Sequence, residues 1–172
     1  MNNIRKLAFI GGGNMAAALI SGLTKRGLPP DRLMVADPSK EQLERLVRDY
    51  AVPTAADNAS AVQGAEVVVL AVKPQQMRAV ALGLAPHLIA SRPLLISVAA
   101  GIPHASLARW FGPSIPVIRT MPNRPALNGF GATGLYAPAS VGAAYRALAE
   151  NIMAAVSATV WVEHESDRKS VV

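Results

Sequence analysis

Residues 7–16 read Leu-Ala-Phe-Ile-Gly-Gly-Gly-Asn-Met-Ala and decide the fold class of this chain. An apolar run ends at Ile10, and the small-residue pattern Gly11-x-Gly13-x-x-Ala16 leads into a second apolar stretch, so a strand, a tight turn and a helix start succeed one another. Gly11 permits the sharp turn, Gly13 leaves room for a pyrophosphate beside the backbone, and Ala16 lets the helix pack close to the strand. Backbone N–H groups and the positive end of the helix dipole then face the anion. The stretch predicts a dinucleotide-binding turn.

A second apolar run supports this interpretation. Leu33 to Ala36 is followed by Asp37, which lies about 20 residues beyond the glycine turn, where an acid that binds the ribose is expected. The choice of cofactor stays open at this point. Asp37 favours the ribose diol of NAD and repels a 2′-phosphate, whereas Ser39 and Lys40 could hold that phosphate. Replacing Asp37 by serine is expected to raise the preference for NADPH.

Strand and helix patterns alternate through residue 123. Further strands are predicted at 66–72, 94–98 and 115–119, and helices at 39–50, from Pro74 onward and from Pro103 through Trp110. Ser39 is the expected N-cap of the first of these helices, with Gln42 three positions on as in a capping box. The residues 121–123 are expected to end the last strand. This order predicts an α/β fold with a Rossmann-type, doubly wound and mostly parallel sheet.

The pattern changes after this point. Residues 133–136 form an edge-strand candidate, residues 141–156 an alanine-rich helix and residues 159–162 another strand. We expect these strands to add an antiparallel pair at one edge of the sheet.

Composition narrows the class of protein. The chain has 172 residues, 51% of them hydrophobic, no cysteine, and histidines at 87, 104 and 164 that are too far apart for a local metal motif. The net charge of +6 comes from scattered lysines and arginines without interleaved aromatic residues, which argues against nucleic acid as a partner and suits an anionic cofactor and a carboxylate substrate. Neither a signal-peptide core nor a membrane-length apolar run is visible, so a cytoplasmic location is expected.

Several loops are predicted to meet at the carboxyl ends of the strands, where open α/β sheets bind their ligands. Lys73 ends a buried strand, and its cation either meets a cofactor phosphate or ribose or extends into solvent. Asn123 lies between prolines, and its amide either orients a ligand or bonds the backbone of its own turn. The spacing leaves both pairs of alternatives open, although we favour the ligand role for Asn123.

Five stretches of the chain together resemble the Δ1-pyrroline-5-carboxylate reductases. The stretches are Phe-Ile-Gly-Gly-Gly-Asn-Met-Ala at 9–16, Ala-Val-Lys-Pro-Gln at 71–75, Ser-Val-Ala-Ala-Gly-Ile at 97–102, Arg-Thr-Met-Pro-Asn-Arg-Pro-Ala at 119–126 and Gly-Ala-Thr-Gly-Leu-Tyr at 131–136. The resemblance runs from about Ile4 to about Asp167. It implies reduction of the C=N bond of pyrroline-5-carboxylate to L-proline, the last step of proline biosynthesis, by hydride from a reduced nicotinamide.

The resemblance also implies roles for particular residues. Cofactor-binding roles fall on Gly11, Gly12, Gly13, Asn14, Met15, Asp37, Ser39, Lys40, Asn58, Ala71, Val72, Lys73 and Pro74. Positions beside the nicotinamide or the substrate fall on Ala99, Ala100, Gly101, Met121, Pro122 and Asn123. The family's preference favours NADPH, with NADH also accepted. A protonated imine is already electrophilic, so alignment with the nicotinamide and exclusion of water are expected to provide most of the rate.

Two departures from the family pattern stand out. Arg124 occupies a position where the family usually has a small threonine, so it either alters the loop near the substrate or points to solvent. Family members also continue past the counterpart of Asp167 into a helical domain that forms the dimer and supplies much of the substrate pocket. Residues 1–165 are therefore expected to form the dinucleotide-binding domain, residues 166–172 to be a tail outside the family pattern, and the catalytic residues and the oligomer contacts to belong to the domain that is missing.

Two alternatives follow from these departures. The chain could bind a dinucleotide with little or no turnover, or it could be a related reductase of the β-hydroxyacid dehydrogenase type, which shares the first β–α–β unit. The Met-Pro-Asn loop at 121–123 argues against the second alternative.

Overall fold

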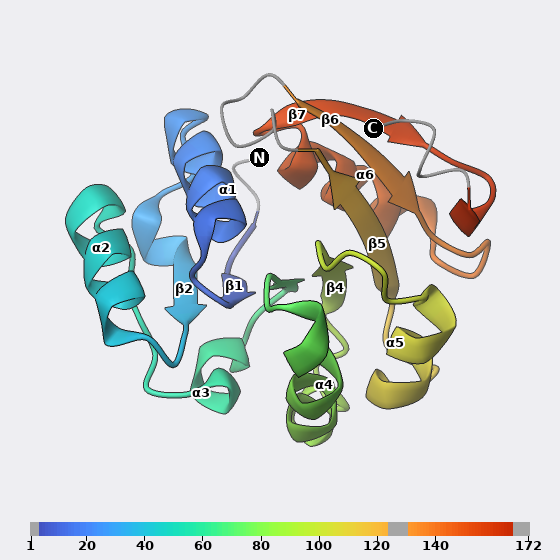
Figure 1. Cartoon of the computed structure of the whole chain (residues 1–172), viewed down its shortest axis with the longest axis horizontal. Coiled ribbons are helices and arrows are strands. Elements are labelled where there is room, and N and C mark those ends of the chain that lie inside the picture. Colours follow the sequence, from blue (N-terminus) through green and yellow to red (C-terminus); the bar gives the residue numbers. More distant parts are fainter. Residues whose placement is uncertain (1–3, 124–130, 167–172) are drawn as a thin grey trace.

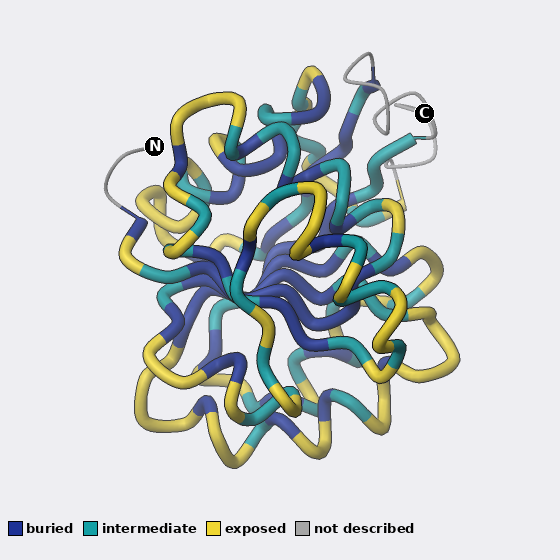
Figure 2. The backbone as a smooth tube through the Cα atoms, turned by 90° about the vertical axis from the view of Figure 1, so that its left-hand side faces the viewer, coloured by how far each residue is buried: buried dark blue, intermediate teal, exposed yellow. Residues whose placement is uncertain are grey.

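The central strands of the sheet are short apolar runs that are buried on both faces. The computed structural model describes residues 4–123 and 131–166. Three strands in its interior, β1 (Leu7–Ile10), β3 (Val67–Leu70) and β4 (Leu94–Ser97), are buried at every residue. Figure 2 shows these strands as a buried centre surrounded by exposed loops and helix faces. Continuous apolar runs of this kind are typical of parallel strands that helices cover on both sides.

The remaining elements alternate along the chain as the sequence predicts. The strands are completed by β2 (Leu33–Ala36), β5 (Val117–Pro122), β6 (Gly131–Tyr136) and β7 (Ser157–Trp161). The helices are α1 (Asn14–Lys25), α2 (Lys40–Tyr50), α3 (Asn58–Val62), α4 (Pro74–Leu88), α5 (His104–Phe111) and α6 (Ala143–Met153), with a 3-10 turn at Pro30–Arg32.

The strand order in the described residues is β2-β1-β3-β4-β5-β6-β7, and β1 to β5 are parallel (Figure 1). The chain passes from β1 to β2 on one side and then to β3 on the other, so a topological switch point lies between β1 and β3. Ligands of such sheets bind outside the carboxyl ends of the strands at this point.

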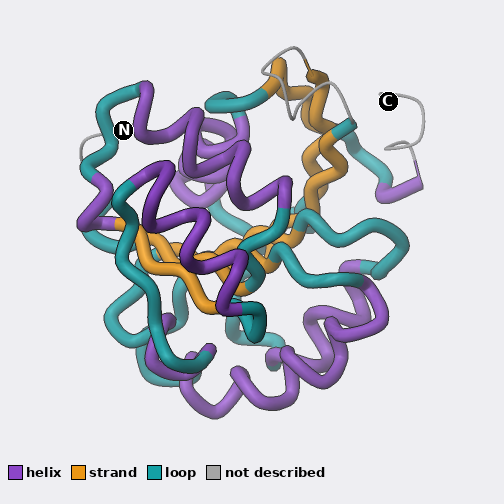
Figure 3. The backbone as a smooth tube through the Cα atoms, turned by 60° about the vertical axis from the view of Figure 1, so that its left-hand side comes forward, coloured by secondary structure: helices purple, strands orange, loops and turns teal. Residues whose placement is uncertain are grey.

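Two hydrophobic clusters pack on opposite faces of the sheet. Residues of α1, α2 and α6 build one cluster, and residues of α3, α4 and α5 build the other. Figure 3 shows the helices on both sides of the strands. The predicted doubly wound α/β fold is therefore confirmed.

The predicted antiparallel feature is present at the β5–β7 edge. β6 pairs antiparallel with β5, and β7 pairs parallel with β6, so the edge pair runs against the other five strands while its two members run together. The reason is the connection: α6 carries the chain from the end of β6 back to the start of β7, and a strand–helix–strand crossover produces parallel strands.

Two local predictions differ from the structure. β5 continues to Pro122, because β6 pairs with it beyond the point where β4 ends at Ser97. Asn123 N donates to Ala132 O, so the neighbouring Pro122 nitrogen is directed away from β6, and its missing N–H breaks no pairing there. The second difference is α3, a short helix that the sequence analysis did not predict although Asp57 caps it.

Candidate functional site

The glycine turn after β1 has a backbone shape that only glycine adopts without strain. Gly11 has φ +99°, and its N–H donates to Ala36 O at 2.8 Å. A Cβ added at Gly11 would lie 2.5 Å from Ala71 O. The first glycine therefore allows the turn and the close approach of the chain that leaves β3.

The third glycine of the turn has a different environment. Gly13 is the N-cap of α1 with an extended backbone (φ −70°, ψ −170°), and a Cβ there would meet no heavy atom within 4 Å. No side chain caps α1, and its first turn contains no acidic residue. The first N–H groups of α1 therefore have no partner within the helix, and the space beside Gly13 is open, as an anion site requires.

Asp37 holds the middle of the same turn. Its Oδ2 accepts from Gly12 N and its Oδ1 accepts from Ser39 N, both at 2.7 Å. The carboxylate thus connects the glycine turn to the start of α2, across 25 residues of sequence. Both oxygens have additional lone pairs, so Asp37 can accept a ribose hydroxyl while it anchors the backbone.

A cavity of about 830 Å³ lies at the switch point and is bordered by these groups. Of the residues that the sequence singled out, its lining contains Gly11, Gly13, Asp37, Ser39, Asn58, Ala71, Val72 and Lys73. The size is that of a cleft for a cofactor or other small molecule. The structure therefore brings residues from four separate stretches, near 11, 37, 58 and 72, to one site.

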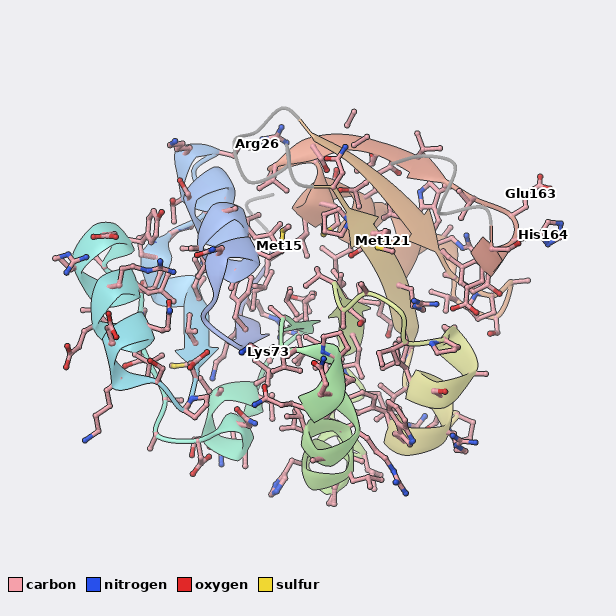
Figure 4. All side chains as sticks on the ribbon, in the orientation of Figure 1. Met15, Arg26, Lys73, Met121, Glu163 and His164 are labelled. Atoms are coloured by element: carbon pink, nitrogen blue, oxygen red, sulfur yellow. The ribbon has the colours of Figure 1, made fainter. Side chains whose placement is uncertain are left out.

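Lys73 is the cation of this cavity. It precedes Pro74, which is the first residue of α4, and no side chain caps that helix either. In Figure 4 Lys73 lies near the start of α4, below α1, and its side chain is exposed. An exposed ammonium beside two uncapped helix N-termini makes the site favourable for phosphate groups.

Asp57 and Ser39 border the same cavity but have partners. Asp57 Oδ1 accepts from Ser60 N at 2.7 Å, and this backbone hydrogen bond lowers the pKa of Asp57 below its usual value. Ser39 Oγ accepts from Gln42 N at 3.4 Å, which confirms Ser39 as the N-cap of α2.

Sequence reasoning missed several residues of the lining. Gln42 lines the cavity, and its Oε1 is buried without a hydrogen-bond partner among the described residues. Gln75, Gln76 and Val80 of α4 also line it. Gln75 and Gln76 follow Lys73-Pro74 in the first turn of a helix that starts at the ligand edge, and that placement was a signal that could have found them.

The other predicted site residues lie outside the lining of this cavity. Gly12 contributes its N–H to Asp37, Met15 packs against the core, Asn14 and Pro74 begin α1 and α4, and Lys40 lines a separate shallow hollow on α2. Ala99, Ala100 and Gly101 follow β4, with Ala99 buried and the other two exposed, while Met121, Pro122 and Asn123 lie at the end of β5. Both groups are at the carboxyl edge, on the side of the sheet beyond β3.

Asn123 has a definite backbone role. Its Oδ1 accepts from Ala132 N at 3.1 Å, and its N–H donates to Ala132 O at 3.2 Å. These bonds extend the β5–β6 pairing, so the amide oxygen fixes the strand connection. Arg124, for which the sequence left open an altered substrate loop or a solvent-facing side chain, lies outside the described residues, as do residues 167–172 of the predicted tail.

Within residues 4–123 and 131–166 we find no group of three or more His, Cys, Asp or Glu side chains placed to hold a metal ion. Over the same residues, the helices are too short or too polar to cross a membrane.

A dinucleotide-type cavity on a doubly wound sheet agrees with comparisons to known proteins. The model of a protein family described as "NADP oxidoreductase coenzyme F420-dependent" matches residues 6–101. The chain belongs to this family.

The similarity to pyrroline-5-carboxylate reductases is also confirmed. The Pseudomonas aeruginosa pyrroline-5-carboxylate reductase is 46% identical over 166 residues, which are 96% of this chain and 60% of that protein. Among solved structures, a pyrroline-5-carboxylate reductase from Coxiella burnetii has a TM-score of 0.93 at 38% identity, covering 97% of this chain and 62% of the other. The Plasmodium falciparum pyrroline carboxylate reductase, solved with NADP bound, has a TM-score of 0.83 at 26% identity, covering 97% and 60%. The chain thus spans about 60% of the length of the curated relatives that it matches here.

Proposed function

We propose that this chain binds NADPH and contributes to the reduction of pyrroline-5-carboxylate to L-proline. The observation that carries the proposal is the cavity at the switch point, where Gly13 leaves open space beside the uncapped start of α1. The relatives supply the substrate class, and the P. falciparum relative with NADP supplies the cofactor class.

The residues present fit a dinucleotide. The pyrophosphate would lie against the N–H groups at the start of α1, with Lys73 adding a positive charge. Asp37 and Ser39 would face the adenosine ribose, with Gln42 lining the same part of the cavity. Bound reduced nicotinamide would supply the hydride for the C=N carbon.

The division of the chain follows from the same placement. We assign residues 1–165 to one dinucleotide-binding unit. Ala99 to Gly101 and Met121 to Asn123 would border the nicotinamide, because they lie at the carboxyl edge beyond the cavity. Small-molecule substrate binding, a cytoplasmic location and the absence of nucleic-acid partners are part of the proposal by similarity to the family. Homo-oligomer formation is assigned to the full-length members of the family and not to this chain.

Titration and turnover test the proposal together. NADPH should bind with an affinity in the micromolar range, and the chain should oxidise NADPH when pyrroline-5-carboxylate is added. Binding without turnover would show that these residues form a cofactor-binding unit and would overturn the claim that they are a working reductase. Failure to bind either NADPH or NADH would overturn the whole proposal.

Asp37 tests the choice between the two cofactors. In Asp37→Ser the ratio of NADPH affinity to NADH affinity should rise about tenfold, because a carboxylate beside the 2′-phosphate is removed. Both affinities should fall, because the anchors to Gly12 N and Ser39 N are lost. Asp31→Ser is the matched control, since Asp31 is an exposed acid of the 3-10 turn outside the cavity lining. An unchanged ratio in Asp37→Ser would show that this carboxylate does not set the preference.

A further inference from the structure

An ion pair far from the cavity connects the segment after β7 to the middle of the sheet. Arg119 of β5 is 1% exposed, and its Nη1 donates to Oε1 of Glu165. The two residues are 46 positions apart. The other ion pair of the described residues, Arg48–Asp49, joins exposed neighbours in sequence. The contact of Glu165 is therefore a long-range tie rather than a surface pair.

The same carboxylate also serves the start of α5. Glu165 Oε1 accepts from the backbone N–H of His104 at 2.6 Å, and His104 is the first residue of that helix. The N-cap residue is Pro103, no side chain from the helix itself caps it, and its first turn contains no acidic residue. The acceptor for this N–H is usually a side-chain oxygen of a local Asp or Ser, and here Glu165 supplies it from 61 positions away.

The start of α5 fixes one end of a short loop. Residues 98–103 connect Ser97, the last residue of β4, to His104, and Ser97 pairs with Arg119 in the sheet. Glu165 thus contacts α5, which follows this loop, and β5, which pairs with β4 before it. Ala100 and Gly101 at its tip are exposed, and Gly101 has φ +78°. Ala99 is buried and its N–H donates to Ser97 Oγ, so β4 holds that end of the loop, whereas Ala100 and Gly101 lie between this contact and His104. The position of His104 therefore bears on the exposed tip of the loop.

We infer that Glu165 is a positioning residue for the nicotinamide half of the site. It acts through His104 N and Arg119 and holds the exposed tip of the loop, Ala100 and Gly101, in place. The inference rests on the proposed function, because the location of the nicotinamide beside this loop is part of that proposal. The adenosine half would bind in the cavity lined by Gly13 and Asp37. Glu165, His104 and Arg119 are not part of that lining.

Paired ligands separate positioning from a general loss of structure. The first ligand is NADPH, and the second is 2′-phospho-ADP-ribose, which has the adenosine half and the pyrophosphate but no nicotinamide. In Glu165→Ala, calorimetric titration should show NADPH binding weakened about fivefold and 2′-phospho-ADP-ribose binding unchanged. Glu165→Gln should recover part of the loss, because its amide oxygen can still accept from His104 N.

Glu163→Ala is the matched control. Glu163 lies two positions earlier, is exposed, and extends outward beyond β7 together with His164 in Figure 4. The control removes the same charge and should change neither affinity. An equal loss of both affinities in Glu165→Ala, or a loss of neither, would overturn the inference.

Amide hydrogen exchange tests the contacts of Glu165 with His104 and Arg119 in the absence of a cofactor. Glu165→Ala and Glu165→Gln should both exchange faster than wild type over residues 98–107, with Glu165→Ala faster of the two, and the strands β1 and β3 should be unchanged. If wild type binds no dinucleotide, the proposed function fails, while faster exchange in these variants would still support the tie from Glu165 to the loop. Unchanged exchange over residues 98–107 would overturn it.

Discussion

Four helices begin around the same cavity, and the N-cap residues that precede them fall into two groups. Ser39 and Asp57 start α2 and α3, and each accepts a hydrogen bond from a backbone N–H of its own helix. Gly13 and Lys73 start α1 and α4, and neither offers a side-chain cap. All four N-cap residues line the cavity.

The presence or absence of a side-chain cap distinguishes helix starts that are satisfied within the protein from those that are available to a ligand. A helix that satisfies its first N–H groups internally presents little to an anion, whereas an uncapped helix leaves those groups for one. α5 represents a third arrangement, since Glu165 from a distant segment provides its cap. α6 also lacks a side-chain cap, but its N-cap Gly142 does not line the cavity. The candidate anion site is therefore where uncapped helix starts border the cavity, at α1 and α4.

Giving α1 a side-chain cap should have the largest expected effect, which is a loss of NADPH affinity. In Gly13→Asp the new carboxylate can accept from the first turn of α1, because the extended backbone of residue 13 suits an N-cap aspartate. Thermal stability should stay equal or rise slightly, while NADPH affinity should fall on the order of 100-fold as the carboxylate takes the place of the phosphate. The two quantities are measured by thermal unfolding and by titration.

Gly142→Asp provides the matched control for that change. Gly142 is the N-cap of α6, has an extended backbone (φ −63°, ψ 159°), and a Cβ there would also meet nothing within 4 Å, but it does not line the cavity. Its stability should respond as in Gly13→Asp, and its NADPH affinity should not change. Equal NADPH binding by the two variants would contradict the assignment of the α1 start as the anion site.

Substitution of Gly11, the first glycine of the turn, should instead lower the stability of the folded chain. Gly11→Ala combines a left-handed backbone with a contact of 2.5 Å to Ala71 O, so we expect a loss of about 2 to 4 kcal/mol in the free energy of unfolding. Gly64→Ala has only the backbone strain (φ +68°, open space for the Cβ) and should lose about 1 kcal/mol. Urea unfolding compares them, and equal losses would show that the approach of Ala71 is not a constraint.

The parts of the site that the sequence predicted are local in the chain. The strand, turn and helix around Gly11 to Ala16 and the cap at Ser39 depend on residues within a few positions of each other, so the pattern alone predicts them. Motif resemblance added Asn58 and residues 71–74, and of these Asn58, Ala71, Val72 and Lys73 line the cavity.

The parts that the sequence did not predict depend on long-range contacts. Asp37 was predicted as a ribose ligand, but the hydrogen bond of its Oδ2 to Gly12 N requires two β–α connections to meet at the switch point. The tie of Glu165 to His104 joins residues 61 positions apart, and neither residue carries a motif of its own. Likewise Gln42 is recognisable as a cavity residue only from the fold, which places it in the lining beside Asp37 and Ser39.

The smallest expected effect is a pH dependence of stability that comes from the side chain of His104 at the start of α5. Burial lowers the pKa of His104, and this outweighs the hydrogen bond to the backbone of Val117 and the charge of Glu165, which act in the opposite direction. The charge of Arg119 also lowers that pKa, and the ring of Tyr136 packs edge-on at 6.0 Å. The folded chain therefore binds a proton at His104 less readily than the unfolded chain does.

The sign of the pH dependence follows from that shift. Stability from His104 should be present above about pH 6.5, the ordinary pKa of histidine, and should be lost as the pH falls from there to its lowered pKa in the folded chain. His104→Gln keeps the backbone N–H that Glu165 binds but removes the titrating ring, so urea midpoints between pH 5 and 7 should vary less than in wild type. His87→Gln, at an exposed position of α4, should retain the wild-type slope. If His104→Gln kept that slope as well, the acid sensitivity would originate elsewhere, and the start of α5 would depend on Glu165 and the backbone alone.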